Sequence, residues 1–456
     1  MWRAARRPQL LLRVAFGDAR CRPTGTCKQA ARRVGFGMWA PAAQLKPDVR
    51  RTKGPRESEH PRASHEDVKS SILVAVRSLS KREAILIAAL IALISYTAAF
   101  IALMRQRHQD ISWFVVAGGS GVDIRLLPPG LSIIPEIEGY DGLSFYRLAL
   151  DPFTRRATDF GITLDTPPYR QQRLLYPIIV HLFSLGRPAS VPTLLVICNL
   201  LAVLCLSIAA SVVATQHGVH PLWGLLIPLY PGFFMAFSRD TSEIVAWAFA
   251  TSALATLGAG RWVWATVLLS CAVLSRETTL ILAVGMAAAY VWQRVSHQRR
   301  AAPAAVFIVP SATYVVWQAI LRSWWGLSGL EAGAIEPAVP FSMYLRLFAE
   351  SAARRTVLMR VHFVECVFWL LLVCVVAVIL VRLAVRLEWR VAWLLYLALA
   401  SILSWEAWGE QVSFMRVLSD LHVVSAVILY GGPAWSRRAV LLATCVVSYY
   451  AMSHMR

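Results

Sequence analysis

Long apolar segments recur along most of this chain, and they constrain its fold more than any other feature. The first runs from Ala84 to Met104, directly after Lys81 and Arg82. About twenty apolar residues in a helix cross the hydrocarbon core of a bilayer, which is ~30 Å thick. Because 57% of the residues are hydrophobic and only 16% are charged, we expect an all-α, polytopic transmembrane protein and not an ordinary soluble one.

Further apolar segments follow, and together they predict about eleven spans. They lie near Val191–Ala214, Leu222–Phe237, Ile244–Leu257, Trp262–Leu274, Thr278–Trp292, Ala304–Trp325, Val361–Val381, Val391–Trp405, Val417–Tyr430 and Ala439–Ser453. A shorter apolar segment, Leu174–Gly186, contains a proline and cannot cross, so we expect a re-entrant or interfacial helix there.

The charges outside the spans predict the orientation. Residues 1–82 hold 19 Lys and Arg against 6 acidic residues, so they carry +13 of the formal net charge of +20. With this basic end inside, alternation also places the basic loops 293–300, 382–390 and 437–438 inside, as the positive-inside rule requires. We therefore expect a cytoplasmic N-terminus in the inner (plasma) membrane. Residues 105–190 then form a large first extracytoplasmic loop.

Two parts of the chain differ in composition. Residues 1–80 are rich in Arg, Pro, Ala and Ser without periodicity, which predicts a disordered cytoplasmic extension, whereas residues 81–456 form the transmembrane domain. The basic surplus lies in a tail and in inner loops, not on the face of a soluble fold, so we expect no nucleic-acid partner. The eight cysteines are scattered without metal-ligand spacing.

Polar residues interrupt the apolar pattern on the predicted outer face. The main groups are Arg239 and Asp240, Arg276 and Glu277, and Glu406 with Arg416. Ionisable groups at membrane depth usually serve a function. Each group also has a structural interpretation as a solvated turn or a buried ion pair, and the tryptophans around Glu406 suit an interfacial anchor.

The stretch from Tyr140 to Pro177 is the most distinctive polar region. A carboxylate just beyond the first span, such as Asp141, can act as a general base, and arginines such as Arg170, Arg173 and Arg276 can bind a phosphate. No strand is followed by a glycine-rich nucleotide-binding turn. An activated donor on the outer face would therefore arrive with the membrane, which points to a polyprenyl-phosphate carrier.

The same stretch resembles a known group of proteins. Gly139-Tyr140-Asp141-Gly142, the following Phe145–Phe153 and the Asp165–Pro177 segment are similar to bacterial polytopic proteins linked to cell-surface glycopolymer formation. More broadly, a large first outer loop with an acidic motif, followed by many spans, resembles the GT-C glycosyltransferases. That resemblance implies that Asp141 is the catalytic base, with Glu138 as the nearby alternative.

These observations predict a membrane glycosyltransferase that moves a sugar from a polyprenyl-phosphate donor to a glycan or lipid acceptor. The expected substrate-binding residues are Tyr140, Tyr169, Arg170, Gln172, Arg173, Arg239, Asp240, Arg276, Glu277, Glu406 and Arg416. The outer carboxylates are also suitable ligands for a divalent cation, although no spacing requires one. A transporter or flippase, a glycan polymerase and a scaffold protein remain alternatives.

Overall fold

A computed structural model shows a protein built almost entirely of helices. It describes residues 79–454 apart from 108, 135–136, 138, 297–301, 334–335, 355 and 410–412, so the expected N-terminal extension lies almost wholly outside the described residues. The strands in the described part are β1 (Thr158–Asp159) and β2 (Ile162–Thr163), which pair as a small antiparallel hairpin. The predicted all-α class is confirmed.

Several helices are long and apolar enough to cross a membrane. Five such segments are α2 (Lys81–Gln106), η3 with α6 (Pro188–Gln216), η5 with α10 (Glu277–Val295), α11 (Ala305–Trp325) and α14 (Val357–Arg382). Four shorter apolar helices are α5 (Leu175–Ser184), α8 (Glu243–Gly258), α9 (Trp262–Ser275) and α18 (Ser419–Tyr430). Two further helices, α15 (Leu387–Ser401) and α19 (Ala434–His454), cover the remaining apolar segments near the C-terminus.

One expected span is not a single helix. The segment expected at Leu222–Phe237 is divided into η4 (Pro221–Leu226) and α7 (Pro231–Ser238). Tyr230 between them is extended, with φ −64° and ψ 131°. The division follows from Pro231, because a proline disfavours the helical conformation of the residue before it and removes a backbone donor.

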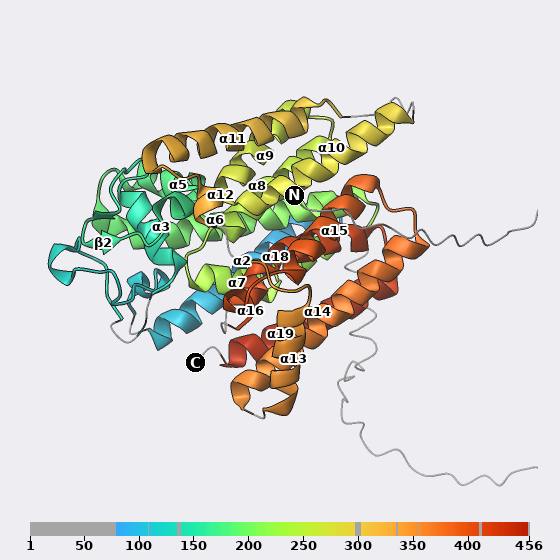
Figure 1. Ribbon diagram of the computed structural model, residues 1–456. Coiled ribbons are helices and arrows are strands. Elements are labelled where there is room, and N and C mark those ends of the chain that lie inside the picture. Colours follow the sequence, from blue (N-terminus) through green and yellow to red (C-terminus); the bar gives the residue numbers. More distant parts are fainter. Residues whose placement is uncertain are drawn as a thin grey trace, which may run out of the picture. The chain divides into compact units, whose positions relative to one another are not determined.

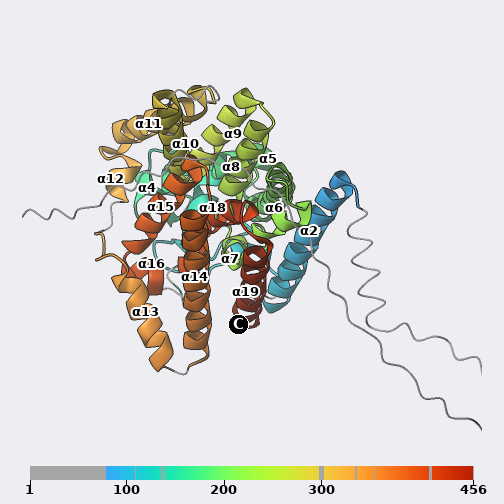
Figure 2. The same cartoon turned by 90° about the vertical axis from the view of Figure 1, so that its right-hand side faces the viewer.

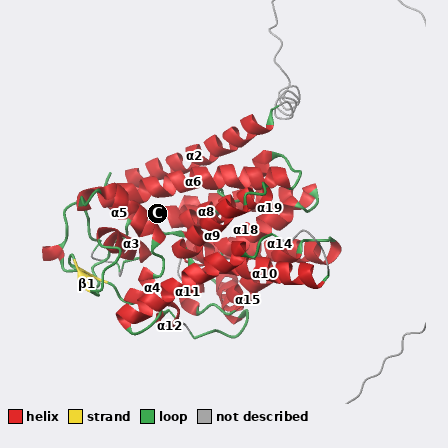
Figure 3. Ribbon diagram, turned by 90° about the horizontal axis from the view of Figure 1, so that it is seen from above, coloured by secondary structure: helices red, strands yellow, loops and turns green. Residues whose placement is uncertain are grey.

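The helices form two neighbouring groups, which can be followed in Figures 1 and 2. In the first group α8 packs against α6 and α9, α2 packs against α6, and α11 packs against α9. In the second group α14 packs against α19 and against α13 (Ser342–Ala353), while α15 packs against α10 and α18. The view from above in Figure 3 shows mainly helices joined by loops, with the small strand pair at one edge.

Helix α2 shows why the fold suits a membrane. Its small residues Ala84, Ala88 and Ala92 are fully buried, whereas Leu90 and Ile94 on its other side are more than half exposed. Small residues let helices approach closely in a bilayer. Large apolar side chains facing outward would be unfavourable in water but are favourable against lipid.

The segment after α2 is folded and not an open loop. It contains η1 (Ile111–Phe114), η2 (Ile124–Leu126), α3 (Asp141–Leu150), the hairpin, α4 (Pro167–Gln171) and α5. Helix α3 packs on α5, and α5 packs on α6. The expected short helix near residues 174–186 is thus confirmed as α5, although its depth in a membrane stays a prediction. Two short helices, α16 (Trp405–Gly409) and α17 (Ser413–Val417), precede α18, and α12 (Gly329–Ala332) follows α11.

Gly285 allows the close packing of α10 on α15. A Cβ atom at this position would lie 2.6 Å from the backbone carbonyl oxygen of Glu388. We expect Gly285→Ala to lower the stability by about 1–3 kcal/mol because the two backbones must separate. Thermal unfolding in detergent measures the change. Val284→Ala, on the exposed side of the same helix, is the control, and an equal loss in both variants would contradict this account.

Candidate functional site

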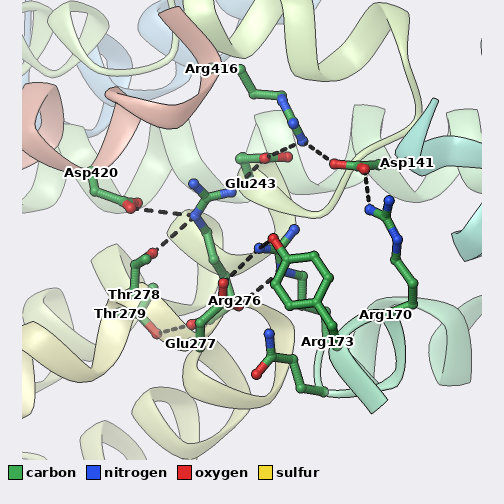
Figure 4. Close-up of polar contacts among 12 residues, drawn as sticks. Asp141, Arg170, Arg173, Glu243, Arg276, Glu277, Thr278, Thr279, Arg416 and Asp420 are labelled. Atoms are coloured by element: carbon green, nitrogen blue, oxygen red, sulfur yellow. Dashed lines mark hydrogen bonds and ion pairs between the residues drawn. The ribbon is translucent and has the colours of Figure 1, made fainter. Parts of the chain in front are cut away.

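Charged side chains from distant segments meet in one place, which we call the ionic cluster. It consists of Asp141, Arg170, Arg173, Glu243, Arg276, Glu277, Arg416 and Asp420. Figure 4 shows these side chains pointing toward one another. They come from α3, α4, α8, η5, α17 and α18, except that Arg173 follows α4 and Arg276 lies between α9 and η5. The cluster lies at the first turns of α8 and α18 and at the junction of α9 with α10.

Asp141 occupies one side of the cluster between two arginines. Its Oδ1 atom accepts a hydrogen bond from Nη1 of Arg170, and its Oδ2 atom accepts one from Nη1 of Arg416 at 2.8 Å. Burial by itself would raise the pKa of Asp141, but the charges of Arg416 and Arg170 outweigh it and hold the pKa well below its ordinary value. The carboxylate is therefore ionised at neutral pH.

Glu243 forms the centre of the cluster. Its Oε1 atom accepts from Nη1 of Arg416 at 2.8 Å and from Nη1 of Arg276 at 2.5 Å. Arg276 also lies 3.4 Å from Asp420, which accepts a further hydrogen bond from the indole Nε1 of Trp247 at 2.6 Å. Glu243 is fully buried and Arg276 is 3% exposed, so each charge depends on its partners for compensation.

Arg173 and Glu277 form a two-pronged pair at the next edge of the cluster. Nε and Nη2 of Arg173 donate to the two carboxylate oxygens of Glu277 at 2.8 and 2.6 Å. Nη2 also donates to the hydroxyl of Tyr169 at 3.1 Å. The ring of Tyr169 lies near the guanidinium groups of both Arg170 and Arg173, which adds a cation–π contribution.

A glycine brings Asp141 to the cluster. A Cβ atom on Gly142 would lie 2.5 Å from the carbonyl oxygen of Arg239 and 2.6 Å from that of Val115. Only glycine lets the first turn of α3 approach the connection between α7 and α8 this closely. Because α8 begins at Glu243, the same contact brings Asp141 near Glu243, and both carboxylates accept a hydrogen bond from Nη1 of Arg416.

Two openings lie next to the cluster. A small pocket of about 10 Å³ is lined by Asp141, Ser144, Phe145, Tyr169, Arg170 and Arg173. A larger one, of about 120 Å³, is apolar and lies among α13, α14, α15 and α18, with Leu418 and Leu421 in its wall. Leu421 directly follows Asp420 and Leu418 lies two residues before it, so the wall of the apolar pocket and the cluster share this part of the chain.

Most of the residues expected at the site are present there. Asp141, Tyr169, Arg170, Arg173, Arg276, Glu277 and Arg416 contact one another as described. The ring of Tyr140 lies 5.0 Å from the guanidinium carbon of Arg416 and 5.5 Å from that of Arg239. Both Tyr140 and Arg239 therefore border the cluster.

Other expected residues have different surroundings. Glu406 is exposed on α16, and Gln172 accepts hydrogen bonds from Tyr314 and Gln318 of α11, so it anchors α4. Asp240 is buried near Asn199 and Arg107, and burial raises its pKa well above the ordinary value against the opposing effect of these two neighbours. Glu138 lies outside the described residues.

Two central residues were absent from the predicted site. Glu243 directly precedes the expected span at Ile244–Leu257, and Asp420 lies inside the expected span at Val417–Tyr430. The available signal for Asp420 was an acidic residue inside an otherwise apolar segment. Among the described residues, no group of three His, Cys, Asp or Glu side chains could hold a metal ion. The carboxylates of the cluster bind arginines instead.

Comparison with known proteins adds no identification. No protein-family description, no curated protein and no solved structure matches this chain. Functional reasoning therefore depends on the geometry of the cluster and its two pockets.

Replacing Glu243 tests how much the cluster contributes to the stability of the protein. Glu243→Gln removes the negative charge that Arg276 and Arg416 share, and we expect it to lower stability by about 3–5 kcal/mol. Glu406→Gln, an exposed position, should change stability by less than about 0.5 kcal/mol. Thermal unfolding of both purified variants measures the difference. If Glu243→Gln unfolds like Glu406→Gln, the cluster contributes little to stability.

Proposed function

We propose that this protein is a membrane glycosyltransferase of the GT-C type. It transfers a sugar from a polyprenyl-phosphate donor to a glycan or lipid acceptor on the extracytoplasmic face. The observation that carries the proposal is the carboxylate of Asp141, which lies between Arg170 and Arg416 at a small pocket. A base and phosphate-binding groups are thus adjacent, as transfer from a phosphate-linked sugar requires.

The arginines provide the contacts that a phosphate needs. Arg170, Arg173, Arg276 and Arg416 keep their charge at any physiological pH, and their planar guanidinium groups bind phosphate oxygens in pairs. Arg170 and Arg173 line the small pocket, so they are the first to meet a donor phosphate. Stabilising the leaving phosphate lowers the barrier because negative charge develops there during the transfer.

Asp141 is the proposed base, as the resemblance to GT-C enzymes also implies. An acceptor hydroxyl attacks C1 of the sugar, and its oxygen forms the new glycosidic bond. The bond between C1 and the phosphate oxygen breaks, and the polyprenyl phosphate leaves with the bonding electron pair. The hydroxyl proton passes to Asp141. Glu138 is the alternative base in the same segment.

The apolar pocket supports a lipid-linked donor. Its wall includes Tyr344, Trp369, Trp408 and Leu421, and such a surface suits a hydrocarbon chain. Leu418 and Leu421 of this wall are close in the chain to Arg416 and Asp420. A molecule with an apolar chain and a charged phosphate therefore finds both kinds of surface within a short distance.

The proposed topology has eleven crossings and a cytoplasmic N-terminus. The spans are α2, α6, η4 with α7, α8, α9, α10, α11, α14, α15, α18 and α19. Alternation then places the starts of α8, α10 and α18 and the end of α9 on the outer face. The ionic cluster lies at these same helix ends, which supports the alternation of the spans, while the loop charges indicate which face is outside.

Labelling of introduced cysteines tests this topology. In intact cells a membrane-impermeant thiol reagent should reach Arg156→Cys in the first loop, because this side chain is exposed. It should not reach Arg386→Cys between α14 and α15, which is equally open but lies on the predicted inner side. The unchanged chain gives the background from its own cysteines. The reverse pattern of labelling would contradict an extracytoplasmic site.

A transfer assay with radiolabelled polyprenyl-phosphate sugars tests the activity. We expect Asp141→Asn to reduce the rate by about 10²–10⁴-fold, the usual contribution of a general base. Asp159→Asn removes a charge from the same loop, where Asp159 pairs with Arg147 and Arg156, and should keep the rate. Movement of a lipid-linked sugar across liposomes without any transfer would favour a flippase or another transporter.

A further inference from the structure

Asp141 accepts hydrogen bonds from the same two arginines that could bind a phosphate, Arg170 and Arg416. Each of its two oxygens accepts a hydrogen bond from a different arginine, Oδ1 from Arg170 and Oδ2 from Arg416. Two oxygens of a phosphate group bridging two arginines would make the same kind of contacts. An anionic ligand entering the small pocket therefore competes with an anion that belongs to the protein.

The charges around Asp141 are already balanced. Arg170 also binds the two oxygens of Asp165 at 2.9 and 2.8 Å. Nη1 of Arg416 donates a hydrogen bond to Glu243 as well as to Asp141. A buried site gains little from an added dianion unless one of its own carboxylates moves away, because like charges repel strongly where water is scarce.

Arg416 retains an unused donor. Its Nε atom is buried and has no hydrogen-bond partner among the described residues, and the residue as a whole is only 7% exposed. A buried donor without an acceptor is unfavourable. Nε shares an edge of the guanidinium group with Nη2, away from the carboxylate of Asp141 at Nη1, so a second anionic group of a ligand, and not the phosphate that replaces Asp141, would satisfy it.

We infer that a phosphate-bearing ligand displaces Asp141 from Arg170 and Arg416, so that binding of the donor itself releases the carboxylate that acts as the base. The role of the released carboxylate rests on the proposed function, but the displacement requires only anion binding. A clamped carboxylate is a poor proton acceptor because the two arginines stabilise its charged form. Once released, it accepts a proton more readily, so the acceptor hydroxyl is activated only when a donor is present.

The sulfate affinity of an Asp141 variant tests the displacement, because displacement predicts a gain in affinity when the competing carboxylate is removed. Inorganic sulfate is the probe, because it is a tetrahedral dianion that does not change protonation over the pH range used. The full chain is purified in nanodiscs of zwitterionic phosphatidylcholine, and sulfate binding is measured by calorimetry. We expect Asp141→Asn to bind sulfate about tenfold more tightly than the unchanged protein, since one competing charge-assisted contact is removed.

Two further variants locate the effect. Asp159→Asn removes one negative charge from the same loop without touching Arg170 or Arg416, and it should leave sulfate affinity unchanged. Arg416→Gln added to Asp141→Asn should abolish the gain. Unchanged or weaker binding by Asp141→Asn would overturn the inference, and so would an equal gain in Asp159→Asn.

The unchanged protein provides a second measurement if Asp141→Asn does not fold. Near pH 4, close to the ordinary pKa of an aspartate, displacement should be accompanied by proton uptake on Asp141. Calorimetry in two buffers with different ionisation enthalpies detects this uptake. Sulfate binding without proton uptake would contradict displacement.

The outcomes for displacement and for activity can be separated. Tighter sulfate binding by Asp141→Asn, with no sugar transfer by the unchanged protein, would disprove the transferase while leaving the displacement intact. Transfer by the unchanged protein, with no gain in sulfate affinity in Asp141→Asn, would mean that Asp141 stays bound to its arginines. In that case the displacement is wrong and the transferase stands.

Discussion

Compensation of buried charge is the constraint on which the rest of this structure depends. Glu243 and Arg276 are almost fully removed from solvent, and an isolated charge in such a place is strongly unfavourable. Each is therefore paired, and the pairs link α3, α4, α8, η5, α17 and α18 with the connections that carry Arg173 and Arg276. Elements far apart in the chain must adopt one arrangement for all of these charges to be balanced together.

The same compensation shapes the chemistry that the site can perform. An arginine that already binds a carboxylate is positioned for an anion but is also occupied, and Asp141 between Arg170 and Arg416 is the clearest example. Asp141, Arg170 and Arg173 line the small polar pocket, and Leu421, which follows Asp420 in the chain, lines the larger apolar pocket. Together they favour a ligand with a charged head and an apolar chain, which is why a lipid-linked phosphosugar is the proposed substrate.

Some contacts and one helix break could not be predicted from the sequence. Arg276 and Glu277 are adjacent and were expected to act together, but Arg276 binds Glu243 and Asp420 whereas Glu277 binds Arg173. Glu406 resembled the other polar groups in sequence but is exposed on α16. The expected span at residues 222–237 is broken because Pro231 begins a new helix.

The amino-acid sequence by itself determined the helical class, the apolar segments and the positions of the polar residues between them, because hydrophobicity acts locally along the chain. Only the tertiary structure decided which charges meet. Asp141 and Arg416 are 275 residues apart, and nothing in their local surroundings specifies the pairing. Their contact follows from helix packing, from the missing side chain of Gly142 and from the need to compensate every buried charge.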